Sequence, residues 1–228
     1  MEYHRLASGS RIRDVILGWQ DGLVNVLGII LGVAAATATT KYVLVAGLAA
    51  TFAESVSMAA VAYTSLKAQN SHYIKELQRE KQEIEEVPET ERKEIRDIYR
   101  KKGFKDPLLS QIVKKITSSK KTWLDIMMKE ELGLTEDKES PSKSAAIVGL
   151  SAVVGSLIPL APFFFLSVSA GIYASLILSI IVLFAVGAVK AKVTIGSKLR
   201  SGIEMSLIGM GAAIIGYLIG SLLGILLA

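Results

Sequence analysis

Two acidic residues lie in apolar stretches of the sequence, where a charged side chain is costly. Asp21 is followed one helical turn later by Asn25, and Glu54 is followed four residues later by Met58. In a helix, each pair shares one face. A charge at the centre of a membrane-spanning helix costs about 2.5 to 3.5 kcal/mol, so both acids require an explanation.

Carboxylate, amide and thioether groups that converge between two helices form a mixed set of hard and soft donors. Such a set suits Fe2+, Mn2+ or Zn2+ better than Mg2+ or Ca2+. A carboxylate also accepts a proton, so such a site can exchange protons for metal. Two simpler interpretations stay open: Asp21 caps a helix or pairs with Arg13, and Met58 fills a packing gap. The predicted transport path consists of Asp21, Asn25, Glu54 and Met58.

A second group of acids lies in a strongly charged stretch between Lys67 and Lys143. Several of these acids are three residues apart, which places each pair on one face of a helix. Facing helices with such carboxylates form sites for two or more divalent ions in helical bundles. Interleaved basic residues leave open an ordinary solvated face. The predicted metal ligands are Glu80, Glu83, Glu91, Glu94, Met127, Met128 and Glu131.

The consecutive Met127 and Met128 favour the metal interpretation of this stretch. Two large apolar side chains next to each other on a short polar helix are not expected to be buried together in a small core. The chain has no cysteine, which excludes disulfides and thiolate sites. Carboxylate, methionine and histidine side chains remain as possible ligands.

The elements that must position these residues follow from the distribution of charge. Mean hydropathy is +0.45, yet 18 of the 26 Lys and Arg and 16 of the 21 acids lie between residues 67 and 143. The flanking regions therefore favour lipid, and the charged stretch favours water. The net charge of +5 comes mainly from short loops beside apolar stretches. This pattern is typical of membrane topology and argues against nucleic acid as a partner.

Five apolar stretches reach the roughly 20 helical residues that cross a bilayer. We expect an all-α, polytopic membrane protein with two spans in residues 1–66, a three-helix cytoplasmic metal-binding domain in 67–143 and three spans in 144–228. Helix breaks are predicted at Val87-Pro88 and between Gly103 and Pro107. The expected spans are residues 15–37, 43–66, 145–166, 168–190 and 203–228.

Basic residues alternate along the boundaries of these spans. They precede the first span, fill the insert and separate the fourth span from the fifth, whereas the other boundaries carry almost none. The pattern predicts a cytoplasmic N-terminus and an external C-terminus. Glycines at one-turn spacing allow either tight packing within one chain or a dimer seam. They are Gly28, Gly32, Gly216, Gly220 and Gly224.

Taken together, these motifs resemble the vacuolar iron transporter family over essentially the whole chain. The resemblance rests on Asp21-Gly22-Leu23-Val24, on the segment Ala53 to Ala60 with Tyr63, on the glutamate-rich insert, and on Met127-Met128-Lys129-Glu130-Glu131. It implies a homodimer that exports Fe2+ from the cytoplasm in exchange for protons, with Mn2+ and Zn2+ as further candidate cargoes. It implies neither an enzyme nor a permanent cofactor.

The resemblance also carries family roles onto residues of this sequence. It assigns the metal path to Asp21, Met58 and Glu54, and it assigns metal binding to the insert residues predicted above. Metal ions, protons, the lipid bilayer and a second copy of the chain are the implied partners. The expected location is a prokaryotic cell membrane, or the vacuolar membrane if the source is a eukaryote.

Two other classes of protein remain as alternatives. One is a membrane-anchored ferroxidase-like storage protein, but a di-iron centre usually has Glu-x-x-His spacing, and His72 has no glutamate three residues before it. The other is a structural membrane protein whose insert docks a partner, which leaves the two intramembrane acids unexplained.

Overall fold

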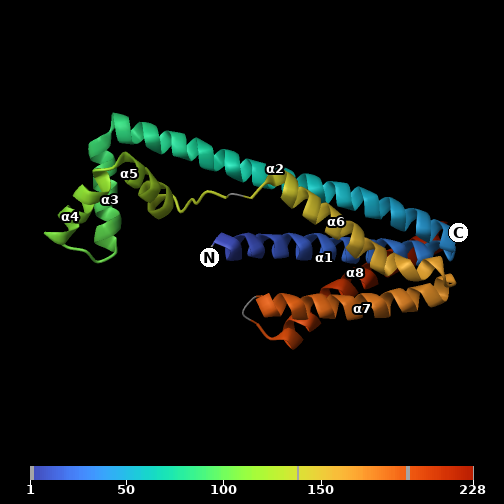
Figure 1. Cartoon of the computed structure of the whole chain (residues 1–228). Coiled ribbons are helices and arrows are strands. Elements are labelled where there is room, and N and C mark those ends of the chain that lie inside the picture. Colours follow the sequence, from blue (N-terminus) through green and yellow to red (C-terminus); the bar gives the residue numbers. More distant parts are fainter. Residues whose placement is uncertain (1–2, 138, 194–195, 228) are drawn as a thin grey trace. The chain divides into compact units, whose positions relative to one another are not determined.

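The structure, a computed structural model, describes residues 3–137, 139–193 and 196–227. These residues form helices and connecting turns, and none of them lies in a strand. The helices are α1 (Tyr3–Thr37), α2 (Thr40–Glu86), α3 (Pro88–Lys101), α4 (Leu108–Thr117), α5 (Lys120–Ile126), η1 (Met127–Glu131), α6 (Pro141–Leu160), η2 (Ala161–Phe164), α7 (Val168–Val193) and α8 (Lys198–Leu227) (Figure 1).

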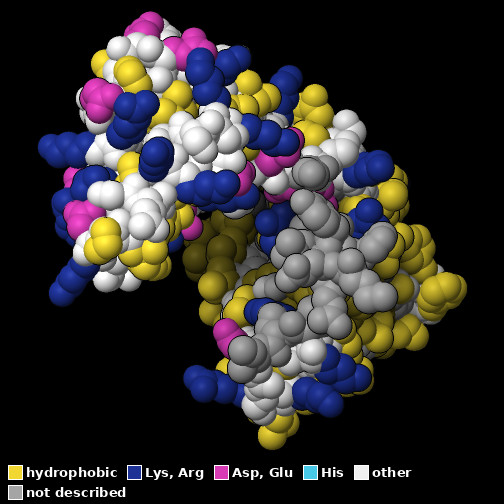
Figure 2. All heavy atoms as spheres, turned by 60° about the vertical axis from the view of Figure 1, so that its left-hand side comes forward, with side chains coloured by type: hydrophobic (Ala, Val, Ile, Leu, Met, Phe, Trp, Pro, Cys, Tyr) yellow, Lys and Arg dark blue, Asp and Glu magenta, His cyan; other side chains and the backbone are white. Residues whose placement is uncertain are grey.

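The chain divides into two compact units. Residues 1–64 and 140–228 form the first, and residues 65–139, here called the insert, form the second. Within the described residues, five helices are long and apolar enough to cross a membrane, which confirms the predicted number of spans. In the view of Figure 2, Lys, Arg, Asp and Glu crowd one part of the visible surface, with hydrophobic side chains scattered among them, and hydrophobic side chains predominate on another part.

In the first unit, α1 packs along both α6 and α8 (Figure 1). The side chains of Leu23, Leu27, Ile30 and Ala34 recur every three or four residues along α1 and are almost fully buried. This spacing places them on one stripe of the helix. The stripe forms the centre of the apolar core of this unit.

Glycines bring α1 and α8 into backbone contact within one chain. A Cβ atom on Gly32 would lie 2.8 Å from the carbonyl oxygen of Gly216, and a Cβ on Gly220 would overlap the carbonyl of Gly32. Only glycine tolerates such an approach. The sequence left open whether these glycines pack within one chain or form a dimer seam. These contacts show packing within the chain.

The insert contains more helical segments than the sequence indicates. The breaks before Pro88 and between α3 and α4 are at the predicted places, but the last predicted helix is divided at Ser118–Ser119 into α4 and α5. Ser119 caps α5 by accepting a hydrogen bond from the Thr122 amide, at 3.4 Å. Because serine is favoured as an N-cap, this local signal competes with helix continuation. The prediction of three insert helices is therefore wrong in this detail.

Gly220→Ala is expected to lower the melting temperature of the detergent-solubilised protein by several degrees. The added methyl group meets the Gly32 backbone, and overpacking of this kind costs about 1 to 3 kcal/mol. Gly211→Ala on the same helix is the matched control, because a Cβ there meets no atom within 4 Å. Equal melting temperatures for the two variants would contradict the close contact between α1 and α8.

Candidate metal centres

The first candidate centre lies between α1 and α2 in the membrane-spanning unit. Asn25 of α1 donates a hydrogen bond from Nδ2 to Oε1 of Glu54 on α2, at 3.0 Å. The carboxyl groups of Asp21 and Glu54 lie within hydrogen-bonding reach of each other. Two carboxyl groups can hydrogen-bond only if one of them carries a proton, since an ionised carboxylate can only accept. The structure thus brings together the three polar residues predicted on α1 and α2.

The alternative pairing of Asp21 with Arg13 is not what the structure shows. Arg13 contacts its neighbour Asp14, with Nη2 3.1 Å from Oδ1. Asp14 is buried and accepts a second hydrogen bond from the Ser144 hydroxyl of α6, at 2.5 Å. Asp14 therefore ties α1 to α6, and Arg13 compensates its charge. The sequence analysis did not identify this acid. Its position beside an arginine at the start of an apolar stretch is nevertheless a signal of an ion pair at the end of a membrane-spanning helix.

One side of this first centre is not covered by the described part of the chain. Asn25 is exposed, as are Leu17 and Ile29, and these residues with Asp21 form a stripe at four-residue spacing along α1. Met58 is half-buried on α2, one turn beyond Glu54. A polar group that faces lipid is costly, so this stripe is a candidate surface for contact with another protein surface.

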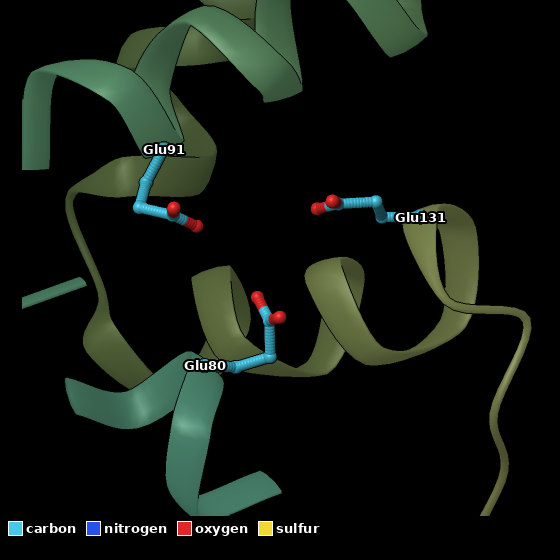
Figure 3. Close-up of side chains that lie close together, drawn as sticks. All are labelled: Glu80, Glu91 and Glu131. Atoms are coloured by element: carbon cyan, nitrogen blue, oxygen red, sulfur yellow. The ribbon is translucent and has the colours of Figure 1, made fainter. Parts of the chain in front are cut away.

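The second candidate centre lies in the insert. Carboxylate oxygens of Glu80 on α2, Glu91 on α3 and Glu131 on η1 lie within 4.8 Å of one another. The three side chains point toward one another from their separate helices (Figure 3). Glu80 and Glu91 are buried, and one oxygen of each has no hydrogen-bond partner. Buried, unsatisfied carboxylate oxygens that converge in this way form a suitable cage for a divalent cation.

Electrostatic repulsion is strong in this cluster. Burial, followed by the charge of Glu94 and the other glutamates, raises the pKa of Glu91 to about 7. Burial, the charges of Glu94, Glu80 and Glu83, and the close approach of the Glu94 carboxyl group raise the pKa of Glu131 to about 7. Glu83 acts on both groups through its charge. The structure thus gathers all five predicted glutamates, and their role as ligands stays a prediction.

The apolar core of the insert holds these acids in place. Glu91 and Ile95 are buried one turn apart on α3, so the same face carries a ligand candidate and a core residue. Ile95 packs with Trp123 and Met127 in the insert core. Lys102, near the end of α3, forms an ion pair with Glu130 of η1, which fixes the turn that carries Glu131.

The argument that Met127 and Met128 cannot both be buried is wrong. Their exposed fractions are 0% and 2%, and Met127 lies in the apolar core. The reason is the π-helical turn η1, in which the Leu132 amide donates to the Met127 carbonyl five residues back. Such a turn accommodates an extra residue and changes the direction of the side chains that follow. Metal binding by either thioether stays a prediction.

Several basic residues that interleave with the acids are engaged elsewhere. Arg92 pairs with Glu89 and lies over the Trp123 ring, 5.7 Å from its centroid. Arg96 pairs with Asp106. Their guanidinium groups therefore neutralise other acids, which weakens the interpretation of the cluster as an ordinary solvated face.

Two residues close to the cluster were not identified from the sequence. Glu76 is buried, and Arg79 contacts Glu76, Glu80 and Glu83. Arg79 is three residues from Glu76 and four from Glu83, but many other charged pairs in this stretch have the same spacing. The sequence therefore did not single out these contacts. Nδ1 of His72 lies 3.8 Å from Oε1 of Glu76. His72 does not belong to the group of three converging carboxylates.

Comparison with known proteins relates the chain to one family. The sequence profile of the VIT family matches residues 12–221. The chain is 36% identical to vacuolar iron transporter 2 of Oryza sativa subsp. japonica over 206 residues, which is 89% of this chain and 83% of that protein. It is 34% identical to vacuolar iron transporter 1 of Arabidopsis thaliana over 204 residues, covering 89% and 82% of the two chains.

A relative from Plasmodium falciparum gives a similar match. The vacuolar iron transporter of Plasmodium falciparum (isolate 3D7) is 32% identical over 233 residues, covering 97% of this chain and 85% of that protein. Because the profile covers nearly the whole chain and these relatives align along most of their length, the family resemblance seen in the sequence is confirmed. The chain belongs to the VIT family.

Proposed function

We propose that this protein carries Fe2+ across a membrane in exchange for protons, and that it also accepts Mn2+. The observation that carries the proposal is the pair Asp21 and Glu54, whose carboxyl groups meet inside the membrane-spanning unit. The nearby Arg13 compensates Asp14 instead. An intramembrane acid pair of this kind is stabilised by a proton or by a metal ion, and alternation between the two is antiport.

Iron as the cargo is supported by the names of the relatives and by the donor set. The aligned proteins are named vacuolar iron transporters. Two carboxyl groups meet at this site, the Asn25 amide bonds to Glu54, and Met58 lies on the adjacent turn. This combination of donors suits a borderline cation such as Fe2+. Mn2+ accepts the same oxygen ligands. Zn2+ is a suitable surrogate in binding measurements.

The insert is proposed to capture the metal before it enters the membrane. Glu80, Glu91 and Glu131 supply the converging oxygens. The basic residues that border the spans favour a cytoplasmic insert, so capture on that side would support export from the cytoplasm. Holding ions near the entrance raises their local concentration, as charged clusters do for other ligands.

A second copy of the chain is proposed to cover the exposed stripe of α1. The stripe combines apolar Leu17 and Ile29, 49% and 44% exposed, with the polar Asp21 and Asn25. A homodimer around these stripes would place two sets of Asp21, Asn25 and Glu54 close to one axis and remove the polar groups from lipid.

Replacing either acid of the membrane centre is expected to abolish exchange. Asp21→Asn and Glu54→Gln remove a proton acceptor and a ligand, and even the loss of an outer partner of a metal ligand costs about 10- to 100-fold. The measurement is Fe2+ flux into proteoliposomes under an imposed pH gradient. Glu204→Gln, an exposed acid of α8, is the charge-matched control. Wild-type flux in Asp21→Asn protein of normal melting temperature would refute the pathway.

Metal binding by the insert is expected to weaken as pH falls. The pKa values of Glu91 and Glu131 are raised to about 7, so both carboxyl groups hold protons below that pH and metal must displace them. Affinity then falls about tenfold per pH unit for each displaced proton and levels off above about pH 7. Calorimetry with Zn2+ in buffers of different ionisation enthalpy counts the protons. The control is Glu91→Gln, and a pH-independent affinity would contradict the cluster as the site.

A single cysteine at position 29 is expected to cross-link two copies. The chain has no cysteine of its own, so Ile29→Cys can form a disulfide only between chains. Oxidation in native-like membranes should give a covalent dimer if the α1 stripes meet within about 7 Å. Ile177→Cys, on the lipid-accessible surface of α7 and 60% exposed, is the control. Equal cross-linking of both variants would argue against this seam.

A further inference from the structure

Arg79 is the cation that the protein itself places beside the carboxylate cluster of the insert. Its guanidinium approaches three glutamates of α2: Nη1 lies 2.8 Å from Glu76, Nη2 lies 3.2 Å from Glu80, and Nε lies 3.6 Å from Glu83. These acids lie three residues before, one after and four after Arg79, so each of them is within about one helical turn of Arg79. The Arg79 side chain is 50% exposed, and those of Glu76 and Glu80 are 10% and 2% exposed.

Glu80 belongs to two groups at once. Its Oε1 accepts a hydrogen bond from Arg79, whereas its Oε2 is buried and has no hydrogen-bond partner. Glu80 is also one of the three residues whose oxygens converge in the candidate metal centre. A divalent cation bound to Glu80 would therefore lie one carboxylate away from the positive charge of Arg79.

Two consequences follow for a metal ion at this centre. The positive charge of Arg79 repels the ion, because the buried carboxylate of Glu80 would bring the two cations close together with little water between them. Arg79 also engages Glu76 and Glu83, and their carboxylates are then not free to turn toward the ion. Both effects lower the affinity of the cluster, and neither removes the three converging oxygens.

We propose that Arg79 is a tethered competitor of the metal cargo, which weakens metal binding at the insert and keeps captured ions exchangeable. This inference rests on the proposed capture of metal by the insert. A conducting site must bind its ion well enough to attract it and weakly enough to release it. Without Arg79, the surplus of glutamates in one small cluster would hold the ion instead of passing it on.

The test is the affinity of the full-length, detergent-solubilised protein for Mn2+, measured from the free-ion signal in electron paramagnetic resonance. Arg79→Gln is expected to bind Mn2+ about tenfold more tightly, as the loss of one adjacent positive charge predicts. Arg79→Lys keeps the charge and is expected to stay close to the wild type. Arg100→Gln is the matched control, because Arg100 pairs with Asp97 and not with the cluster.

Transport provides the second readout. In proteoliposomes, Arg79→Gln is expected to lower both the half-saturating metal concentration and the maximal rate, a combination that simple damage to the fold does not produce. Unchanged or weaker Mn2+ binding in Arg79→Gln would overturn the inference, as would equal tightening in Arg100→Gln. Wild-type binding that is insensitive to Glu91→Gln would instead overturn the capture proposal, and with it the role of Arg79.

Discussion

The structure depends on how carboxylates are tolerated where water is scarce. A buried charge needs a partner, and a proton, an arginine and a metal ion can each fill that role. Asp14 has Arg13 and Ser144, which makes it a fixed structural contact. Asp21 on α1 and Glu54 on α2 have each other and Asn25, and in the proposed mechanism this pair is the place where a proton and a metal ion exchange. Asp14 and Asp21 lie on the same helix, but only Asp14 is paired with an arginine.

Close backbone packing gives the pair Asp21 and Glu54 a rigid setting. The glycine contacts between α1 and α8 hold α1 against the core, so Asp21 and Asn25 keep a fixed direction. In the insert, the apolar core around Ile95 and Trp123 serves the same purpose for Glu91. Both candidate centres therefore combine a stiff scaffold with acids that are only partly compensated, and under the proposed function a change in proton occupancy would change metal occupancy.

Hydropathy and charge distribution were sufficient to predict five spans and a charged insert, because both properties are summed over many residues. The proximity of Asp21 and Glu54 could also be predicted from the sequence, because an acid in an apolar span needs a polar partner. The burial of Met127 and Met128 could not be predicted from the sequence, because a single π-helical turn changes which side chains point inward. The contacts of Arg79 depend on the conformation of its side chain. Many acids in this stretch lie at similar spacing, and spacing alone does not show which of them Arg79 contacts.

The most direct test of this account is a paired flux measurement on the wild-type protein. Fe2+ and proton movements are recorded in the same proteoliposomes, first with a metal gradient alone and then with an imposed pH gradient. The account predicts that a metal gradient drives protons in the opposite direction and that the pH gradient accelerates metal movement. Metal flux that moves no protons and ignores the pH gradient would contradict it.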